Sequence, residues 1–416
     1  MPFSMKVCSV FLVAIGFVIA SPSQAPHSQL SPVTRVGSIL LVDGQEWKAV
    51  GPNIYWLGLD ENVIPPAGQP FYAPTDASYP TIDRITEEMA VVKALGGTMI
   101  RAHTLGISVG NPLSVWPEAN VVNEKAFDII DWAVYQAGQY GVRLLVPLVD
   151  NYDYYHGGKY TFLRWAGFDL TQTKDSNNPE IQQFYTNTDI IATFKDYVKT
   201  ILTHRNQYNN LTYAEDPTIF AYESGNELLG PVWGDQNCPA DWVKNIAQYV
   251  KGLAPKKLFL DGTYGVNETH LDIDEIDIFS NHFYPPNVTI LQSDIDKVKS
   301  AGKVYFAGEY DWVGKSGGAP LESFFTVLEE SSGVGGDQFW SLFGHNAPDC
   351  NTFVSHNDGF AMQYGNPDNT VYTDQRIQLI RKHFVAMSEG ISISSNETLP
   401  TVSCPAAPPR RRHQLY

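Results

Sequence analysis

The 416-residue chain has 45 acidic and 28 basic side chains, which give it a formal net charge of −17. This excess of negative charge argues against nucleic acids and anionic membranes as partners, because both carry charge of the same sign. Hydrophobic residues make up 43% of the chain and aromatic residues 12%. The composition therefore fits a globular protein with a sizeable core and an uncharged substrate.

The first twenty residues have the composition of a secretory signal peptide. Lys6 is followed by an apolar run over residues 7–20, which is short for a membrane span. Sequons of the form Asn-x-Thr begin at Asn210, Asn267, Asn287 and Asn396. We therefore expect a secreted, extracellular glycoprotein without a membrane partner.

Cysteine usage points to one disulfide. Cys8 lies in the predicted signal peptide, so Cys238, Cys350 and Cys404 remain in the mature chain. One disulfide and one free thiol is the simplest arrangement, and the sequence does not choose the pair. The spacing does not suggest a zinc site, and we expect no metal and no other cofactor.

Residues 21–36 are rich in Ser, Pro and Gln and are predicted to be a flexible lead-in. Residues 38–50 predict a hairpin with its turn at Asp43-Gly44, suited to plug the closed end of a barrel. At the other end of the chain, residues 391–416 are rich in Ser, Thr and Pro, and we expect a loosely ordered tail.

Between these ends, apolar runs of strand length alternate with helical patterns. Strands are predicted at residues 51–57, 98–101, 143–149, 218–222, 257–260, 276–280, 304–306 and 337–340. Helices are predicted at residues 81–95, 123–139, 188–203, 239–253, 292–301, 321–330 and 374–387. Only the helix between the fifth and sixth strands lacks a clear signal. Eight strand–helix units predict a single α/β domain, a (β/α)8 TIM barrel over residues 37–390. A doubly wound open sheet is the alternative, but no Gly-rich nucleotide fingerprint supports it.

Two of the predicted strands lead into a glutamate. Residues 218–222 precede Asn226-Glu227, and residues 303–307 precede Gly308-Glu309. In a parallel barrel the carboxyl ends of all strands meet at one face, so these two side chains are expected to lie together. A single Glu is usually a solvated surface group. A pair at this face instead indicates glycoside hydrolysis, which needs a general acid and a second carboxylate.

With these segments in place, the chain resembles the family 5 glycoside hydrolases of clan A, most closely the fungal endo-β-1,4-mannanases. Other segments that carry the resemblance are Ile54–Trp56, Ile100-Arg101, the loop 151–158, Arg164–Gly167, Phe184–Asn187, Asp216–Ile219, His282–Tyr284 and Phe339-Trp340. Together they cover nearly the whole mature chain. The motifs are more specific for the family than for the sugar.

The resemblance implies a role for each matching residue. Glu227 would be the acid/base and Glu309 the nucleophile of a retaining double displacement. For this mechanism we expect a raised pKa at Glu227 and a carboxyl separation of about 5 Å. Asn226 would hold the sugar at subsite −1, and Arg101 would hydrogen-bond near Glu309 and keep it ionised.

Three further residues take their roles from the same resemblance. Tyr284 would donate a hydrogen bond to the nucleophile, His282 would orient the acid/base region, and Trp340 would stack on the sugar at subsite −1. From its position on the predicted fourth strand, Glu223 is expected to form a supporting ion pair.

Three departures from the mannanase pattern lie near the subsites. His103 follows the predicted second strand where an aromatic residue is usual, and the run 222–228 differs from the usual Trp-Glu-x-x-Asn-Glu-Pro. Tyr152 stands where a loop tryptophan is expected. His103 either hydrogen-bonds a sugar hydroxyl or is a neutral packing residue. Trp56 and Tyr152 are predicted to stack on sugars, whereas for Trp233 and Trp312 stacking on a sugar and packing in the core or rim both stay open.

The sequence therefore predicts a secreted, monomeric, retaining hydrolase that cleaves internal β-1,4-mannosidic bonds of a polysaccharide or oligosaccharide. Another family 5 β-glycosidase stays open, either a β-glucanase or an exo-acting β-mannosidase or glucosidase. A wall built by the insertion between Tyr152 and Thr188 would favour exo action. An inactive carbohydrate-binding wall protein is an alternative of a different class, although the complete set of site residues argues against it.

Overall fold

The computed structural model describes residues 30–63, 71–72, 76–170, 178–229, 238–394 and 397–406. Every structural statement below concerns this part of the chain. The predicted signal peptide, Trp233, the sequon at Asn396 and the last ten residues lie outside it.

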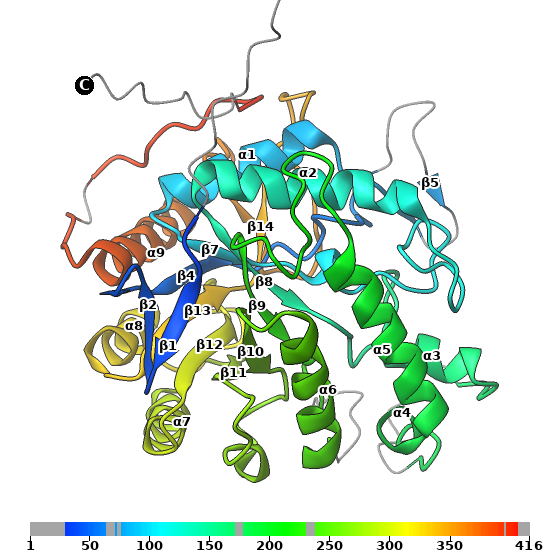
Figure 1. Cartoon of the computed structure of the whole chain (residues 1–416). Coiled ribbons are helices and arrows are strands. Elements are labelled where there is room, and N and C mark those ends of the chain that lie inside the picture. Colours follow the sequence, from blue (N-terminus) through cyan, green and yellow to red (C-terminus); the bar gives the residue numbers. More distant parts are fainter. Residues whose placement is uncertain are drawn as a thin grey trace, which may run out of the picture.

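Eight parallel strands form the central sheet, in the order β4-β13-β12-β11-β10-β9-β8-β7 (Figure 1). They are β4 (Ala49–Pro52), β7 (Met99–Arg101), β8 (Arg143–Pro147), β9 (Ile219–Glu223), β10 (Leu258–Asp261), β11 (Ile278–Phe283), β12 (Val304–Tyr310) and β13 (Val334–Phe339). A bridge from Asn53 to Arg101, next to β4 and at the end of β7, brings the two edge strands together. The predicted (β/α)8 barrel is confirmed.

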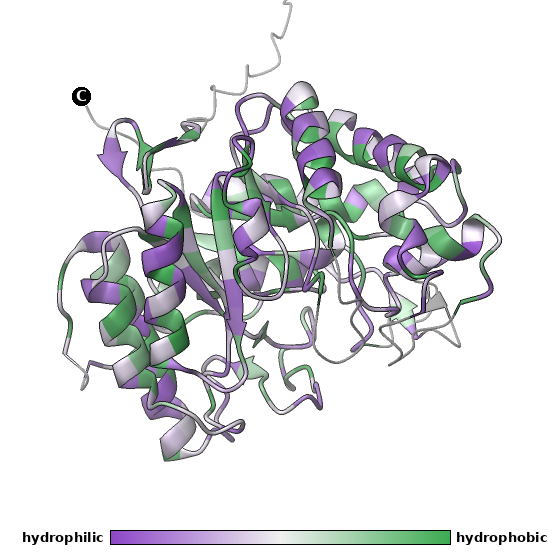
Figure 2. Ribbon diagram, turned by 90° about the horizontal axis from the view of Figure 1, so that it is seen from below, coloured by the Kyte–Doolittle hydropathy of each residue, from purple (hydrophilic) through white to green (hydrophobic). Residues whose placement is uncertain are grey.

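Helices surround the strands. The main ones are α1 (Ile82–Ala94), α2 (Glu124–Tyr140), α5 (Thr188–Thr203), α6 (Ala240–Leu253), α7 (Val288–Ser300), α8 (Leu321–Glu330) and α9 (Val371–Glu389). A short 3-10 helix, η2 (Glu268–His270), stands between β10 and β11, where the sequence had no helix signal. Each main helix mixes hydrophobic and hydrophilic residues (Figure 2), as expected when one face packs on the barrel. In the described residues no helix has the length and apolar character of a membrane span.

The N-terminal strands close one end of the barrel. β1 (Val33–Val36), β2 (Ile39–Val42) and β3 (Gln45–Glu46) form an antiparallel sheet. Its turn has positive φ at Asp43 (50°) and Gly44 (77°), the geometry of a type I′ turn. Leu40 packs inside the barrel, and the ring of Trp47 contacts that of Phe220 at 5.2 Å. The predicted plug is confirmed.

Three boundaries differ from the prediction. Val33–Val36 pairs with β2, so the end of the predicted flexible lead-in is a strand. The hairpin ends at Glu46, and the first barrel strand is β4, which ends at Pro52 and not at residue 57. The apolar residues after Pro52 are buried although they lie outside the strand. Their hydrophobicity therefore reflects burial and not pairing with a neighbouring strand.

Part of the predicted loose tail is fastened to the barrel. A disulfide joins Cys350 to Cys404, and Cys238 is buried outside it. Tyr364 Oη donates to the carbonyl oxygen of Pro400 over 2.6 Å, close to this disulfide. The prediction of a loosely ordered tail is therefore wrong for residues 397–406.

Candidate active site

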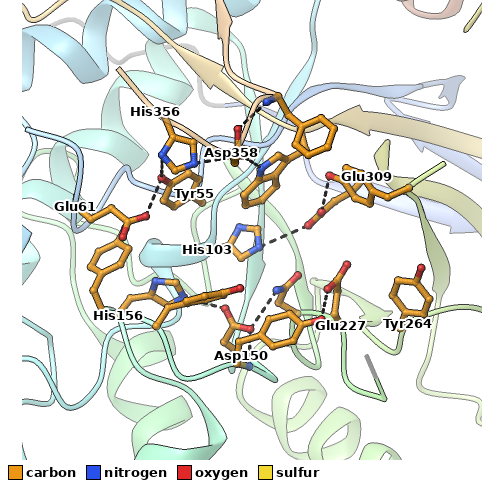
Figure 3. A pocket seen from close by; sticks show the side chains of 17 residues that line it. Tyr55, Glu61, His103, Asp150, His156, Glu227, Tyr264, Glu309, His356 and Asp358 are labelled. Carbon is orange, nitrogen blue, oxygen red and sulfur yellow. Dashed lines mark hydrogen bonds and ion pairs between the residues drawn. The ribbon is translucent and has the colours of Figure 1, made fainter. Parts of the chain in front are cut away.

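The two predicted carboxylates lie in one cavity at the carboxyl ends of the strands. Glu309 belongs to β12, and Glu227 follows β9 by four residues. Both line a cavity of about 590 Å³ (Figure 3). An oxygen of each carboxyl group and a ring nitrogen of His282 all lie within 4.8 Å of one another. This matches the predicted separation and the spacing of about 5 Å typical of retaining glycosidases, and it is shorter than the ~6.5–9.5 Å of inverting ones.

Arg101, at the end of β7, organises the floor of this cavity. Its Nε and Nη2 donate to the two oxygens of Glu223 over 2.7 and 2.8 Å. Its Nη1 donates to Glu309 over 2.8 Å, and Nη2 also donates to Asn226 Oδ1 over 3.0 Å. The guanidinium is 1% exposed. Its rigid fork therefore fixes three groups at once, as predicted for Glu223 and Glu309.

Glu309 accepts a second hydrogen bond from Tyr284 Oη over 3.0 Å. Arg101 and Tyr284 donate to this carboxylate, and donors of this kind favour its ionised form. Burial and the charge of Glu227 nevertheless raise the pKa of Glu309 to about 7, although His282, Arg101 and Tyr284 oppose the rise. Glu309 therefore keeps a proton to a higher pH than an ordinary carboxyl group does.

Glu227 has a different set of partners. His282 Nδ1 lies 2.6 Å from one carboxyl oxygen, and Tyr152 Oη donates to the other over 2.6 Å. Burial raises the pKa of Glu227, but these two hydrogen bonds, with the charges of His282 and Arg101, lower it overall. The prediction of a raised pKa at Glu227 is therefore wrong for the free site.

The reason lies in His282. Burial lowers its pKa, but the charges of Glu309 and Glu227 outweigh burial and raise it. In the free site His282 therefore holds the proton of the 2.6 Å hydrogen bond that joins it to Glu227. Its transfer across that short hydrogen bond would make Glu227 the acid. His282 thus contacts Glu227, the position the resemblance implied for it.

Trp340 and Asn226 also line the cavity. The indole of Trp340 stacks on Tyr55 with centroids 5.3 Å apart and an interplanar angle of 8°. Its Nε1 donates to Asp358 over 2.7 Å, which fixes the orientation of the ring. The amide nitrogen of Asn226 donates to Asp150 over 3.2 Å. Both positions fit the predicted contacts with a sugar.

Trp56 does not belong to the cavity, so its predicted stacking on sugar is wrong. It is fully buried, its Nε1 donates to the carbonyl of Leu342 over 3.2 Å, and Arg84 lies over its ring at 4.1 Å. Its neighbour Tyr55 lines the cavity instead. Trp312 likewise packs in the core and donates to the carbonyl of Phe360.

Sequence reasoning missed several lining residues because they come from loops. They are Tyr55, Glu61, Tyr154, Tyr155, His156, Tyr264, His356, Asp358 and Phe360. Tyr152 was predicted to stack on sugar, and it does line the cavity, but its hydroxyl bonds the Glu227 carboxylate. The run Tyr-Asp-Tyr-Tyr at residues 152–155, in the loop that follows β8, was the sequence signal that could have indicated these lining residues.

Two groups of side chains have the spacing of metal ligands. One is Glu227, His282 and Glu309 of this cavity, and the other is Glu87, His345 and Cys404. The sulfur of Cys404 is bonded in the disulfide, so it is not available as a thiolate ligand. In the cavity, the carboxylates are already engaged by Arg101 and by hydrogen bonds.

Residues 71–316 match the model of the family described as "GH family 5 beta-mannosidase-like". The chain belongs to this family. It is therefore a glycoside hydrolase, as predicted. It is 28% identical to mannan endo-1,4-beta-mannosidase 1 of Arabidopsis thaliana over 313 residues, which are 70% of this chain and 69% of the relative. It is 30% identical to mannan endo-1,4-beta-mannosidase 2 of Oryza sativa subsp. japonica over 268 residues, 64% of this chain and 55% of the relative.

Solved structures share the fold. The endo-1,4-beta-mannanase from Rhizomucor miehei superposes with a TM-score of 0.65 at 21% identity, covering 85% of this chain and all of that chain. The glycoside hydrolase family 5 mannosidase from the same organism has a TM-score of 0.65 at 17% identity and covers 88% of this chain and all of its own.

Proposed function

We propose that this glycoside hydrolase cleaves internal β-1,4 bonds of mannans with retention of configuration, through Glu309 as nucleophile and Glu227 as acid/base. The observation that carries the proposal is the approach of the two carboxyl groups to within 4.8 Å in one cavity. The names of the plant relatives support mannan as the substrate.

In the first step, a Glu309 oxygen forms a bond to the anomeric carbon while the bond to the leaving oxygen breaks. Glu227 gives its proton to that oxygen. Tyr284 and Arg101 donate to Glu309 and favour the ionised form that attacks. In the second step, Glu227 takes a proton from water, whose oxygen displaces Glu309 from the sugar.

The proton of the acid comes from the site itself. As the Glu309 oxygen bonds to the anomeric carbon it loses its charge, so the electrostatic cause that keeps the proton on His282 weakens in the same step; the proton then passes across the 2.6 Å contact to Glu227 as Glu227 gives a proton to the leaving oxygen. Asn226, held by Arg101 and facing the cavity, is placed to bind the 2-hydroxyl of the sugar. Trp340 offers its ring to the sugar at subsite −1.

The test is reducing-sugar release from galactomannan, linear mannan, carboxymethylcellulose and a β-1,3/1,6-glucan, with Glu309→Gln as control. Release from the mannans alone, absent in the variant, is the expected result. The anomer formed first, followed by proton NMR, should be β. Release of reducing sugar from glucans only would show that the proposed substrate is wrong. An α-anomer as the first product would overturn the double displacement.

A second candidate is exo action, which the loops at one end of the cavity favour. Tyr155 Oη donates to the carbonyl of Leu59 over 2.8 Å. His356 Nδ1 lies 2.8 Å from Asn62 Oδ1 and 3.3 Å from Tyr55 Oη. The loops after β4, β8 and β13 are thus joined on the side away from Tyr264 (Figure 3). Part of this wall comes from the insertion that begins at Tyr152.

Mannohexaose labelled at its reducing end separates endo from exo action. An endo-enzyme releases unlabelled fragments of several lengths in the first minutes. If the wall closes the end that holds the non-reducing sugars, the unlabelled fragment has one short fixed length. That outcome would remove the endo proposal while leaving the retaining chemistry intact.

We also propose that the protein is secreted and glycosylated. The N-terminal sequence and the disulfide of Cys350 and Cys404 fit an oxidising compartment. Asn210 is exposed, and Asn287 is partly exposed at the start of α7. Mass spectrometry of protein from culture medium should find residues 1–20 removed and sugar at these asparagines. Full-length, unmodified protein retained in cells would contradict secretion.

A further inference from the structure

A cluster of three aromatic side chains lies at the surface, outside the cavity. Trp132 and Tyr135 belong to α2, and Tyr208 belongs to the loop that follows α5 and lies on α2 (Figure 1). The ring of Tyr208 stacks on that of Tyr135 with centroids 5.3 Å apart at 27°, and it meets Trp132 with centroids 5.3 Å apart at 71°. Tyr135 thus covers one face of the Tyr208 ring. Because Tyr208 is still 42% exposed, the opposite face is open to solvent.

A tight hairpin carries the sequon asparagine Asn210 next to this ring. The backbone amide of Asn206 donates to the carbonyl of Leu211, and the amide of Asn210 donates to the carbonyl of Asn206, both over 2.9 Å. The loop between them ends with a positive φ of 60° at Asn210, a conformation that asparagine tolerates. Two peptide units separate Asn210 from Tyr208, so their Cα atoms are at most about 7.6 Å apart. A sugar linked to Asn210 is therefore within reach of the Tyr208 ring.

The side chain of Asn210 is used differently from those of the two other sequon asparagines that the structure describes. Asn287 Oδ1 caps α7 by accepting two backbone hydrogen bonds of 3.0 Å. Asn267 Oδ1 accepts from the amide and the hydroxyl of Thr269 over 3.1 and 2.8 Å. Asn210 is exposed, and among the described residues only its backbone atoms are hydrogen-bonded. A sugar on Asn210 therefore displaces no contact of the fold.

We propose that the first sugars of a glycan on Asn210 pack against the open face of Tyr208 and hold this hairpin on α2. Nδ2 of Asn210 bonds to C1 of the first sugar as the bond from C1 to a lipid-linked pyrophosphate breaks, and the amide nitrogen loses one proton. A pyranose ring has a face of C–H groups, and the face of an aromatic ring carries the partial negative charge that attracts them. The glycan thus covers aromatic surface that is otherwise exposed. The inference rests on the proposed glycosylation and not on the proposed substrate.

A double-mutant cycle on protein secreted from a eukaryotic host measures this contact. Asn210→Asp removes the glycan and keeps a residue that tolerates positive φ, and Tyr208→Leu removes the ring. The measurement is hydrogen exchange of the backbone amides of residues 205–213, followed by mass spectrometry. Loss of the glycan should speed this exchange about fivefold in wild type and less than twofold in Tyr208→Leu. Tyr208→Phe keeps the ring and should keep the fivefold effect. Tyr372→Leu, at a tyrosine of α9 that is 54% exposed, is the matched control and should keep it as well.

An equal effect of Asn210→Asp in wild type and in Tyr208→Leu would overturn the inference, because the glycan would then act without the ring. Loss of the effect in Tyr208→Phe would overturn it too, since the hydroxyl and not the aromatic face would be the contact. Mass spectrometry that finds sugar on Asn287 but none on Asn210 would remove this inference and leave the proposed glycosylation in place. Secreted protein without sugar at any sequon would overturn both.

Discussion

The hydroxyl of Tyr152 tunes the pKa of Glu227, the proposed acid/base, and its removal should shift that pKa in a predictable direction. In Tyr152→Phe, Glu227 loses a 2.6 Å hydrogen bond that favours its ionised form. A hydrogen bond to a charged group contributes about 1.5–3 kcal/mol and one between neutral groups about 0.5–1.5 kcal/mol. The ionised form therefore loses about 1–1.5 kcal/mol more than the protonated form. Since 1.36 kcal/mol corresponds to one pKa unit, the pKa of Glu227 should rise by about one unit.

The assay is kcat/KM for an aryl β-mannobioside against pH, which reports the free enzyme. The alkaline limb, where the hydrogen-bonded pair of Glu227 and His282 loses its proton, should move to higher pH by about one unit in Tyr152→Phe. Tyr372→Phe is the matched control, because that hydroxyl donates to the carbonyl of Val313, remote from the carboxyls. A limb that stays in place, or moves to lower pH, would refute the argument that Tyr152 stabilises ionised Glu227.

Three other predictions concern stability and binding. Burial lowers the pKa of His383, but Asp337 and Glu329 raise it to about 9. Protonated His383 therefore stabilises the fold fully below pH 6.5, and this stabilisation is lost as the pH rises to 9. In urea unfolding, the excess stability of wild type over His383→Gln should shrink by about 3 kcal/mol across that window; a constant difference would contradict it. Cys404→Ser opens a disulfide that spans 54 residues, and calorimetry should find a loss of about 4 kcal/mol; an unchanged Tm would mean the tail adds nothing. Trp340→Ala should raise KM at least tenfold for oligosaccharides, and an unchanged KM would exclude stacking on this ring.

The residues on strands could be predicted because a parallel barrel brings all carboxyl ends to one face. Glu309 and Arg101 lie in strands, and Glu227 follows its strand closely, so the fold alone brings them together. Trp56 was misplaced for a related reason. The strand before it ends at Pro52, several residues earlier than expected, so the alternation of side chains did not continue to Trp56. Its neighbour Tyr55 reaches the cavity instead.

The protonation of the site could not be predicted from the two glutamates alone. The direction of the pKa shift of Glu227 depends on His282. His282 is 55 positions away in the sequence, and its Nδ1 lies 2.6 Å from the Glu227 carboxyl group. The contact of the His103 ring with Arg101 is equally invisible in the sequence. Loop residues such as His356 and Glu61 reach the cavity through turns whose hydrogen bonds only the structure reveals.

Arg101 connects these observations. Its guanidinium donates to Glu309, Glu223 and Asn226 and also contacts His103. A single group therefore contacts Glu309, the amide next to Glu227 and the ring of His103. Because Arg101 is buried and its fork is rigid, none of these contacts moves independently of the others. Glu223 accepts two of its hydrogen bonds and balances part of its charge. A substitution at Arg101 would therefore disturb Glu309, Asn226 and His103 together.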